Sequence, residues 1–129
     1  MSYYFTTAKK NLPFENAIEK VTAALKEQGF GVLTEIDVKE TFKKKLDVEF
    51  KKYKILGACN PNFAYKAISS EDKIGVFLPC NVVVSENNKG EVEITAVDPV
   101  SSMISVKNEK LIELATEVQG RLKKVIQEL

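Results

Sequence analysis

Histidine and tryptophan are missing from this 129-residue sequence, and only two cysteines and four prolines occur. Without histidine the chain can form neither a serine–histidine–acid triad nor a zinc site with imidazole ligands, and it has no imidazole for acid–base chemistry near neutral pH. Two cysteines are too few for a disulfide framework. We therefore expect both to be thiols in a reducing compartment.

Long hydrophobic runs and an excess of one charge are also missing. No apolar run approaches the roughly 20 residues that cross a bilayer, and no basic segment followed by an apolar stretch opens the chain. These absences predict a cytoplasmic protein without a membrane partner. The 19 Lys and Arg residues nearly balance 18 Asp and Glu, giving a net charge of +1. Duplex-DNA binders draw most of their affinity from excess positive charge, so we expect no nucleic-acid partner.

The length and the hydrophobic fraction of 44% predict one domain spanning residues 1–129. Single cores usually occupy roughly 100–200 residues. A chain of this size buries about two-thirds of the surface that its unfolded form exposes. It therefore needs neither a metal nor a disulfide to fold.

Apolar periodicity indicates two long helices, at 13–28 and 108–128. Phe14, Ile18, Val21 and Leu25 recur at helical spacing in the first, and a leucine-rich stripe runs through the second. Extended or alternating segments predict strands at 2–8, 31–36, 53–59, 75–84 and 91–97, and short helices are expected at about 38–46 and 61–69.

This order predicts an α+β fold, in which a single antiparallel sheet has helices packed on one face. The order of elements is β-α-β-β-β-β-α with short helical inserts. Pro79 cannot donate a ladder hydrogen bond, so a bulge or local edge is expected there. Because a single sheet leaves long edge strands, we expect a homodimer.

Cys59 and Cys80 form the candidate site. Cys59 ends a strand directly before Asn60-Pro61, which is typical of a helix start. Backbone N–H groups at a helix start can stabilise a thiolate, so Cys59 is a candidate nucleophile, redox thiol or soft-metal ligand. Cys80 lies in an apolar strand, where a dry environment raises the pKa of a thiol. The alternative is that both cysteines are packing residues, because free cysteine is often buried as a small hydrophobe.

Whether the two thiols meet depends on strand register. If Cys59 faced Gly75 across a regular ladder, Cys80 would lie about 16 Å further along its strand. Only a different register, or a partner chain, would then bring the thiols together.

Three polar residues accompany the cysteines. Asn60 and Asn81 are candidate amide donors toward a bound anion or carbonyl. For Asn60 a helix cap is the favoured interpretation, because asparagine is preferred at N-caps. Asn81, flanked by apolar residues, would need hydrogen-bond partners if buried. Asp98, before Pro99, could present a carboxylate at a strand end, but a turn is the simpler explanation.

A lysine-rich stretch runs from the helix predicted at 38–46 to the start of the strand predicted at 53–59. It comprises Lys39, Lys43, Lys44, Lys45, Lys51, Lys52 and Lys54. An anionic partner is conceivable, but Glu40, Asp47 and Glu49 are interleaved and arginine, which phosphate recognition prefers, is missing from the stretch. A solvated face is the simpler interpretation.

Four segments carry a resemblance to a known family. They are 29–38 (GFGVLTEIDV), 55–61 (ILGACNP), 75–84 (GVFLPCNVVV) and Asp98-Pro99. Together they resemble the bacterial and archaeal family called domain of unknown function 302. The resemblance implies a TATA-binding-protein-like fold and a compact homodimer. It implies neither an activity nor DNA binding, since fold does not carry function. The family's signature positions fall on Cys59, Asn60, Pro61, Pro79, Cys80, Asn81, Asp98 and Pro99.

Two functional hypotheses follow from these residues. In the first, a small molecule or a soft metal binds around Cys59 and Cys80, with Asn60, Asn81 and Asp98 nearby. In the second, the protein is a non-catalytic homodimeric scaffold or interaction module whose cysteines only pack. No general base is well placed in the sequence, so no catalytic residue, metal or cofactor is assigned.

Overall fold

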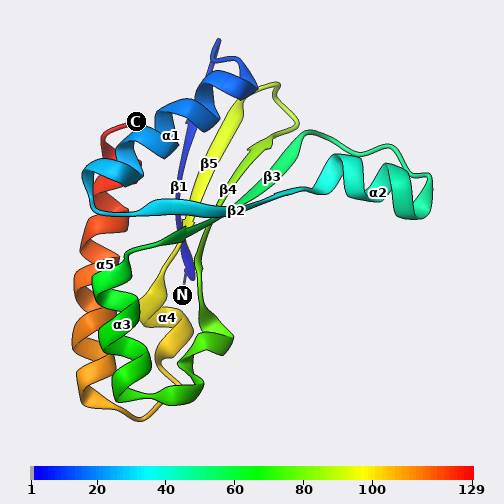
Figure 1. Ribbon diagram of the computed structural model, residues 1–129. Helices are drawn as coiled ribbons and strands as arrows, with labels where there is room; N and C mark the ends of the chain where they lie inside the picture. The colour runs from blue at the N-terminus through cyan, green and yellow to red at the C-terminus, as the bar shows by residue number, and fades with distance from the viewer. Residues whose placement is uncertain (1) are drawn as a thin grey trace.

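A computed structural model describes residues 2–129 and shows one five-stranded antiparallel sheet with the strand order β1-β5-β4-β3-β2 (Figure 1). The strands are β1 (Tyr4–Lys9), β2 (Gly31–Asp37), β3 (Tyr53–Cys59), β4 (Cys80–Glu86) and β5 (Val92–Val97). The helices are α1 (Phe14–Glu27), α2 (Val38–Leu46), α3 (Pro61–Ser70), the 3₁₀ helix η1 (Asp72–Phe77), α4 (Pro99–Met103) and α5 (Glu109–Gln127). The predicted α+β class, the single antiparallel sheet and the order of elements are confirmed.

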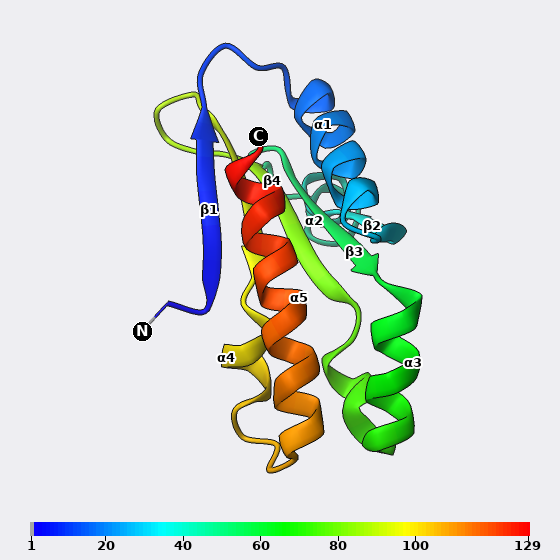
Figure 2. The ribbon, with the colours of Figure 1, turned by 90° about the vertical axis from the view of Figure 1, so that its left-hand side faces the viewer.

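Helices α1 and α5 lie side by side over one face of the sheet (Figure 2). Along β5 the side chains of Val92, Ile94 and Ala96 are buried beneath these helices, while the alternating residues are half-exposed. The core between the layers joins apolar residues of α1, α5 and the three central strands. This alternation confirms the strand predicted at 91–97.

A second, smaller core lies beyond the end of the sheet. It is built from Ala67 of α3, Ile74 of η1, Met103 of α4, and Leu111 and Ala115 of α5. Helix α5 contributes to the main core from Val118 onward. One helix therefore ties the two cores together: its second half lies on strands and its first half lies only on other helices (Figure 2).

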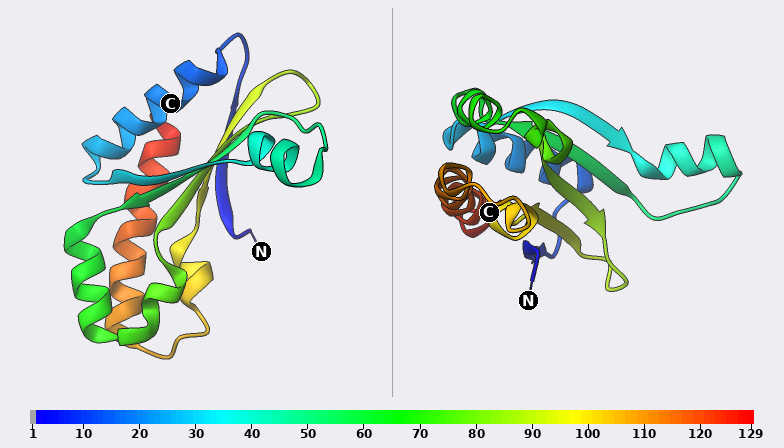
Figure 3. Two further views of the ribbon diagram at one scale, coloured as in Figure 1. Left: turned by 45° about the vertical axis from the view of Figure 1, so that its right-hand side comes forward. Right: turned by 90° about the horizontal axis from the view of Figure 1, so that it is seen from below.

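The inserts begin at side-chain caps. Asp37 accepts a hydrogen bond from the Glu40 N–H at 3.0 Å and starts α2. Helix α2 has no buried residue and projects from the body as an arm beyond the end of β2 (Figures 1 and 3).

The predicted strand at 75–84 is wrong in its first half. Residues up to Phe77 form η1, and β4 begins only at Cys80. Ile74 is buried in the second core beside Ala67 of α3, so this apolar segment packs against α3 rather than pairing with a strand. Val76 points away from this contact and is 82% exposed. Pro79, which has no N–H, directly precedes the ladder.

The register between β3 and β4 also differs from the one considered above. Ala58, not Cys59, faces β4, and its partner is Cys80. Cys59 therefore lies one residue diagonally from Cys80 instead of several residues away. The difference arises because β4 starts five residues later than the sequence pattern suggested.

Gly57 allows two segments to converge over β3. A Cβ atom at this position would collide with the Thr34 side chain of β2 and would lie 2.8 Å from Cγ of Pro79. Only a hydrogen in place of the side chain leaves room for both neighbours. Gly120, in the middle of α5, has no neighbour within 4 Å of such an atom.

We therefore expect Gly57→Ala and Gly120→Ala to have opposite effects. Gly57→Ala should lower the free energy of unfolding by about 1–3 kcal/mol, the usual cost of overpacking. Gly120→Ala should raise it by up to about 1 kcal/mol, because alanine is the better helix former. Urea denaturation followed by circular dichroism measures both. Equal effects of the two substitutions would contradict the close approach at Gly57.

Candidate functional site

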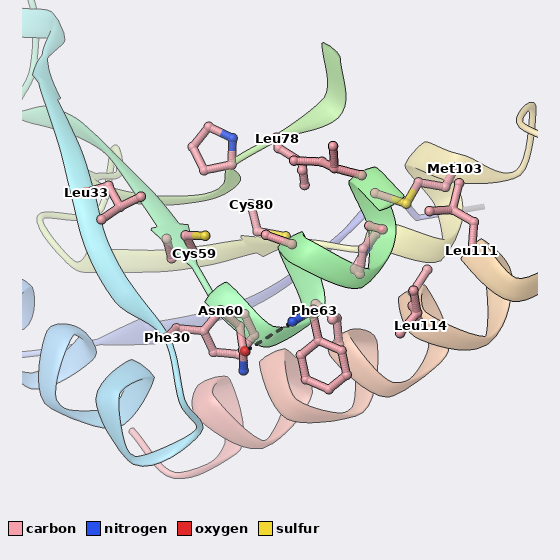
Figure 4. Close-up of a pocket in the computed structure, with 18 of the residues that line it drawn as sticks. Phe30, Leu33, Cys59, Asn60, Phe63, Leu78, Cys80, Met103, Leu111 and Leu114 are labelled. Carbon is pink, nitrogen blue, oxygen red and sulfur yellow. Dashed lines mark hydrogen bonds between the residues drawn. The ribbon is translucent and has the colours of Figure 1, made fainter. Parts of the chain in front are cut away.

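A cavity of about 310 Å³ lies where the sheet ends and the two cores meet (Figure 4). Its walls come from β2, β3, the start of β4, α3, α4 and α5. The lining residues are Phe30, Leu33, Thr34, Ala58, Cys59, Asn60, Phe63, Ala64, Ala67, Ile68, Leu78, Pro79, Cys80, Pro99, Met103, Leu111, Leu114, Ala115 and Val118.

The lining is almost entirely apolar. Apart from the two thiols, only Thr34 and Asn60 bring a polar side chain, and none of the lining residues within 2–129 is charged. Leu33 and Ile68, 70% and 43% exposed, carry the apolar surface from the cavity to the outside. Such a cavity favours an uncharged molecule, because a buried charge without a partner is strongly disfavoured.

Both cysteines line this cavity, so the structure brings the two predicted thiols to one place. In Figure 4 they lie between Leu33 on one side and Met103 and Leu111 on the other. Both are half-buried free thiols. The shift in register, rather than a partner chain, accounts for their proximity.

Burial, together with a smaller contribution from the charge that Cys59 would carry as a thiolate, raises the pKa of the Cys80 thiol to about 11. The dry environment predicted for Cys80 is therefore confirmed. At neutral pH this thiol is protonated and behaves as a small apolar group with a weak S–H donor.

Asn60 is the N-cap of α3, as its position before Pro61 predicted. Its side-chain Oδ1 accepts a hydrogen bond from the Phe63 N–H at 3.4 Å (Figure 4), and the residue is only 8% exposed. Gly29, with φ +87°, passes close by, since a Cβ atom there would lie 2.8 Å from Asn60 Nδ2. The cap and this glycine fix the strand-to-helix corner that carries Cys59.

The other two predicted site residues lie outside this cavity. Asp98 is the N-cap of α4, where the sequence favoured a turn: its Oδ1 accepts from the Val100 and Ser101 N–H groups at 3.0 and 3.4 Å and from Nε2 of Gln119 at 3.0 Å. Its carboxylate is therefore occupied by the fold. Asn81 is exposed rather than buried and lines a neighbouring cavity.

The apolar residues that dominate the cavity were missed by sequence reasoning. Phe30, Phe63, Met103 and Leu111 are indistinguishable by type from core residues, and the leucine-rich stripe of α5 has the same periodicity as a helix face that packs in a core. The usable signal was the length of α5, whose first half extends past the strands.

Two further features concern metal binding and membrane insertion of residues 2–129. Across residues 2–129, no group of three or more Cys, Asp or Glu side chains is placed to hold a metal ion. No helix in the same range is long and apolar enough to cross a membrane.

The lysine-rich stretch lies on the α2 arm and is interleaved with acids. Lys43 contacts Asp47 and Glu49 at 2.9 and 3.0 Å, and Lys44 contacts Glu40 at 2.8 Å. All of these side chains are more than half exposed, so each pair contributes little to stability. The pairs agree with the interpretation of a solvated face.

The fold and the cavity define a small α+β protein with a helix-covered antiparallel sheet and an apolar pocket at its end. Residues 5–129 match the family described as "Domain of unknown function DUF302", and the chain belongs to that family. It is similar to the crystal structure of an uncharacterized conserved DUF302 protein from Bacillus stearothermophilus, with 28% identity, a TM-score of 0.90 and 98% of each chain covered. A comparison with curated proteins finds no match.

The raised pKa of Cys80 predicts slow alkylation in the folded protein. In a Cys59→Ser variant, which leaves Cys80 as the single thiol, the pKa should fall below about 11 because the charge of Cys59 is lost, yet stay above the ordinary value because burial is the larger cause. A group with a pKa near 11 is thiolate in about one molecule in a thousand at pH 8. Iodoacetamide labelling should therefore accelerate above pH 9 in the folded chain and at lower pH in urea. Equal rates in both states at pH 8 would contradict the dry environment.

Proposed function

We propose that the protein binds a small, uncharged organic molecule in the cavity between the end of the sheet and helices α3, α4 and α5. The observation that carries this proposal is the volume of about 310 Å³ combined with a lining free of charged side chains. Ligand pockets are typically concave, mostly apolar and about 300–1,000 Å³ in size.

The thiols support binding more than chemistry. Cys80 is protonated at neutral pH, and its raised pKa makes it a poor nucleophile. Within the described range the cysteine pair has no third ligand for a metal ion. Both sulfurs therefore act as soft, polarisable contacts for an apolar ligand. A cytoplasmic location, which we propose from the sequence, would keep both of them as thiols.

A fluorescent apolar probe tests this function. 1-N-phenylnaphthylamine should bind saturably to the wild-type protein with increased fluorescence, and Ala64→Phe, which fills the cavity from α3, should weaken binding at least about tenfold. Ala23→Phe is the matched control, because Ala23 is exposed on the outside of α1. Circular dichroism checks that both variants fold.

The result should also appear at the thiols: saturating probe should slow alkylation of Cys59, which lines the same cavity. A probe that binds Ala64→Phe and wild-type protein equally, or that fails to saturate, would refute the pocket as the binding site.

A second proposal concerns the sheet face that α1 and α5 leave uncovered. On this face Ile36, Ile55 and Val83 stand in one cross-strand row over β2, β3 and β4. The row continues into Thr95 and Thr6, whose hydroxyls are hydrogen-bonded to each other at 2.9 Å. The face is therefore apolar on the side of the α2 arm and polar on the side of β1.

We propose that a second copy of the chain covers the apolar half of this face, giving the homodimer expected from the sequence. Ile36 is 49% exposed, and β2 has a free edge. A net charge of only +1 leaves little repulsion between copies. A two-fold pair would bury the same patch on both chains.

Sedimentation velocity of single-residue variants tests the dimer. The wild-type protein should sediment as a dimer, and Ile36→Lys should sediment as a monomer, because it places a charge in the contact. Ile104→Lys is the control: Ile104 is 68% exposed and lies after α4, far from the row along the chain. A monomeric wild-type protein, or an Ile36→Lys variant that remains dimeric, would overturn the proposal.

A further inference from the structure

A second cavity, of about 260 Å³, adjoins the first. It is lined by Val76, Phe77, Leu78, Pro79, Cys80, Asn81, Val97, Pro99, Ser102 and Met103. Five of these residues also line the first cavity: Leu78, Pro79, Cys80, Pro99 and Met103. The two cavities therefore share a wall made from the segment before β4 and from α4.

The sheet itself is open at this wall. The ladder between β4 and β5 ends at the pair Val82–Ala96. Beyond it Cys80 and Asn81 continue toward η1, while Val97 pairs with Tyr4 of β1 and leads into α4. The segments on either side of β4 and β5 therefore separate at this point, where Cys80 and Pro99 line both cavities. Met103, a flexible thioether side chain, lies at the same junction and can adapt its shape to a ligand.

The cavities differ in chemistry. The second one offers the Asn81 amide and the Ser102 hydroxyl beside apolar side chains. The Ser102 hydroxyl donates to the Asp98 carbonyl at 3.3 Å, which leaves its oxygen free to accept. Asn81 is exposed, and over residues 2–129 its side chain makes no hydrogen bond. Its amide can both donate and accept.

We propose that the ligand of this site is an uncharged amphiphile, with an apolar chain in the first cavity and a neutral hydrogen-bonding head beside Asn81 in the second. This proposal rests on the proposed function and adds the chemical class of the ligand. In this proposal the chain of the ligand passes between Cys80 and Pro99, which line both cavities beyond the last β4–β5 pair, and the amide and hydroxyl are partners for the head.

The head is neutral because neither cavity has a charged lining residue within the described chain. Leaving a carboxylate or an ammonium group there would remove it from water without an ion-pair partner. An alcohol or amide head group has a much smaller free-energy cost of leaving water, and it forms new hydrogen bonds with Asn81.

Three ligands of equal chain length test the proposal by displacement of 1-N-phenylnaphthylamine: decane, 1-decanol and decanoate at a pH where it is ionised. We expect 1-decanol to bind about three- to tenfold more tightly than decane, which is the gain from one neutral hydrogen bond. Decanoate should bind more weakly than 1-decanol by at least about tenfold.

Variants at Asn81 locate the head. Asn81→Leu should remove the preference for 1-decanol over decane and leave decane binding unchanged. Asn88→Leu is the matched control, because Asn88 is exposed in the β4–β5 hairpin, away from both cavities. Because both positions are exposed, neither variant disturbs the core.

The outcomes separate the two proposals. If the probe itself does not bind, the proposed function fails. If the probe binds but decane and 1-decanol displace it equally, if decanoate binds as tightly as 1-decanol, or if Asn81→Leu leaves the preference intact, the pocket stands and the amphiphile proposal is overturned.

Discussion

The structure depends on one helix that packs against two different partners. From Val118 onward α5 packs on the strands, whereas Leu111 and Ala115 pack on α3, η1 and α4. The seven residue steps from Val118 back to Leu111 extend the helix by about 10 Å past the main core. The cavity lies where the two cores meet, and residues of both line it.

The second constraint is the way β4 begins. Pro79 has no N–H for the ladder, and Gly57 lets Pro79 and Thr34 approach from either side of β3. The start of β4 at Cys80 fixes the register, and the register brings Cys80 beside Cys59. Strand pairing therefore brings both thiols to the same cavity. The walls of the cavity around Cys80 are apolar, and burial is the main cause of the raised pKa of this thiol.

Sequence reasoning succeeded where one local signal decided the outcome. The stripe of α1, the alternation of β5, and the caps Asp37 and Asn60 all follow from periodicity or from a short side chain before a helix. It failed at 75–84, where the apolar composition fits a strand or a buried helical turn equally well, and only the tertiary contacts of Ile74 select the turn.

The site was predictable to the same limited extent. Cys59, Asn60 and Cys80 were selected by residue type, but their meeting required a register that no local pattern encodes. Asn81 was expected among apolar neighbours, yet the alternation of β4 turns it outward once Val82 points to the core. The apolar lining was invisible because a leucine that faces a cavity and a leucine that faces a neighbour have the same periodicity.

The two proposed functions are linked by geometry. Asn81 pairs with Gly57 on the face of the sheet that α1 and α5 leave uncovered, the same face that carries the apolar row of Ile36, Ile55 and Val83. The second cavity is therefore lined in part by a residue of the face that carries the proposed dimer contact. A copy seated on that face would lie close to the head of a bound amphiphile. Ligand binding and association of the chains would then influence each other equally in both directions, as linkage requires.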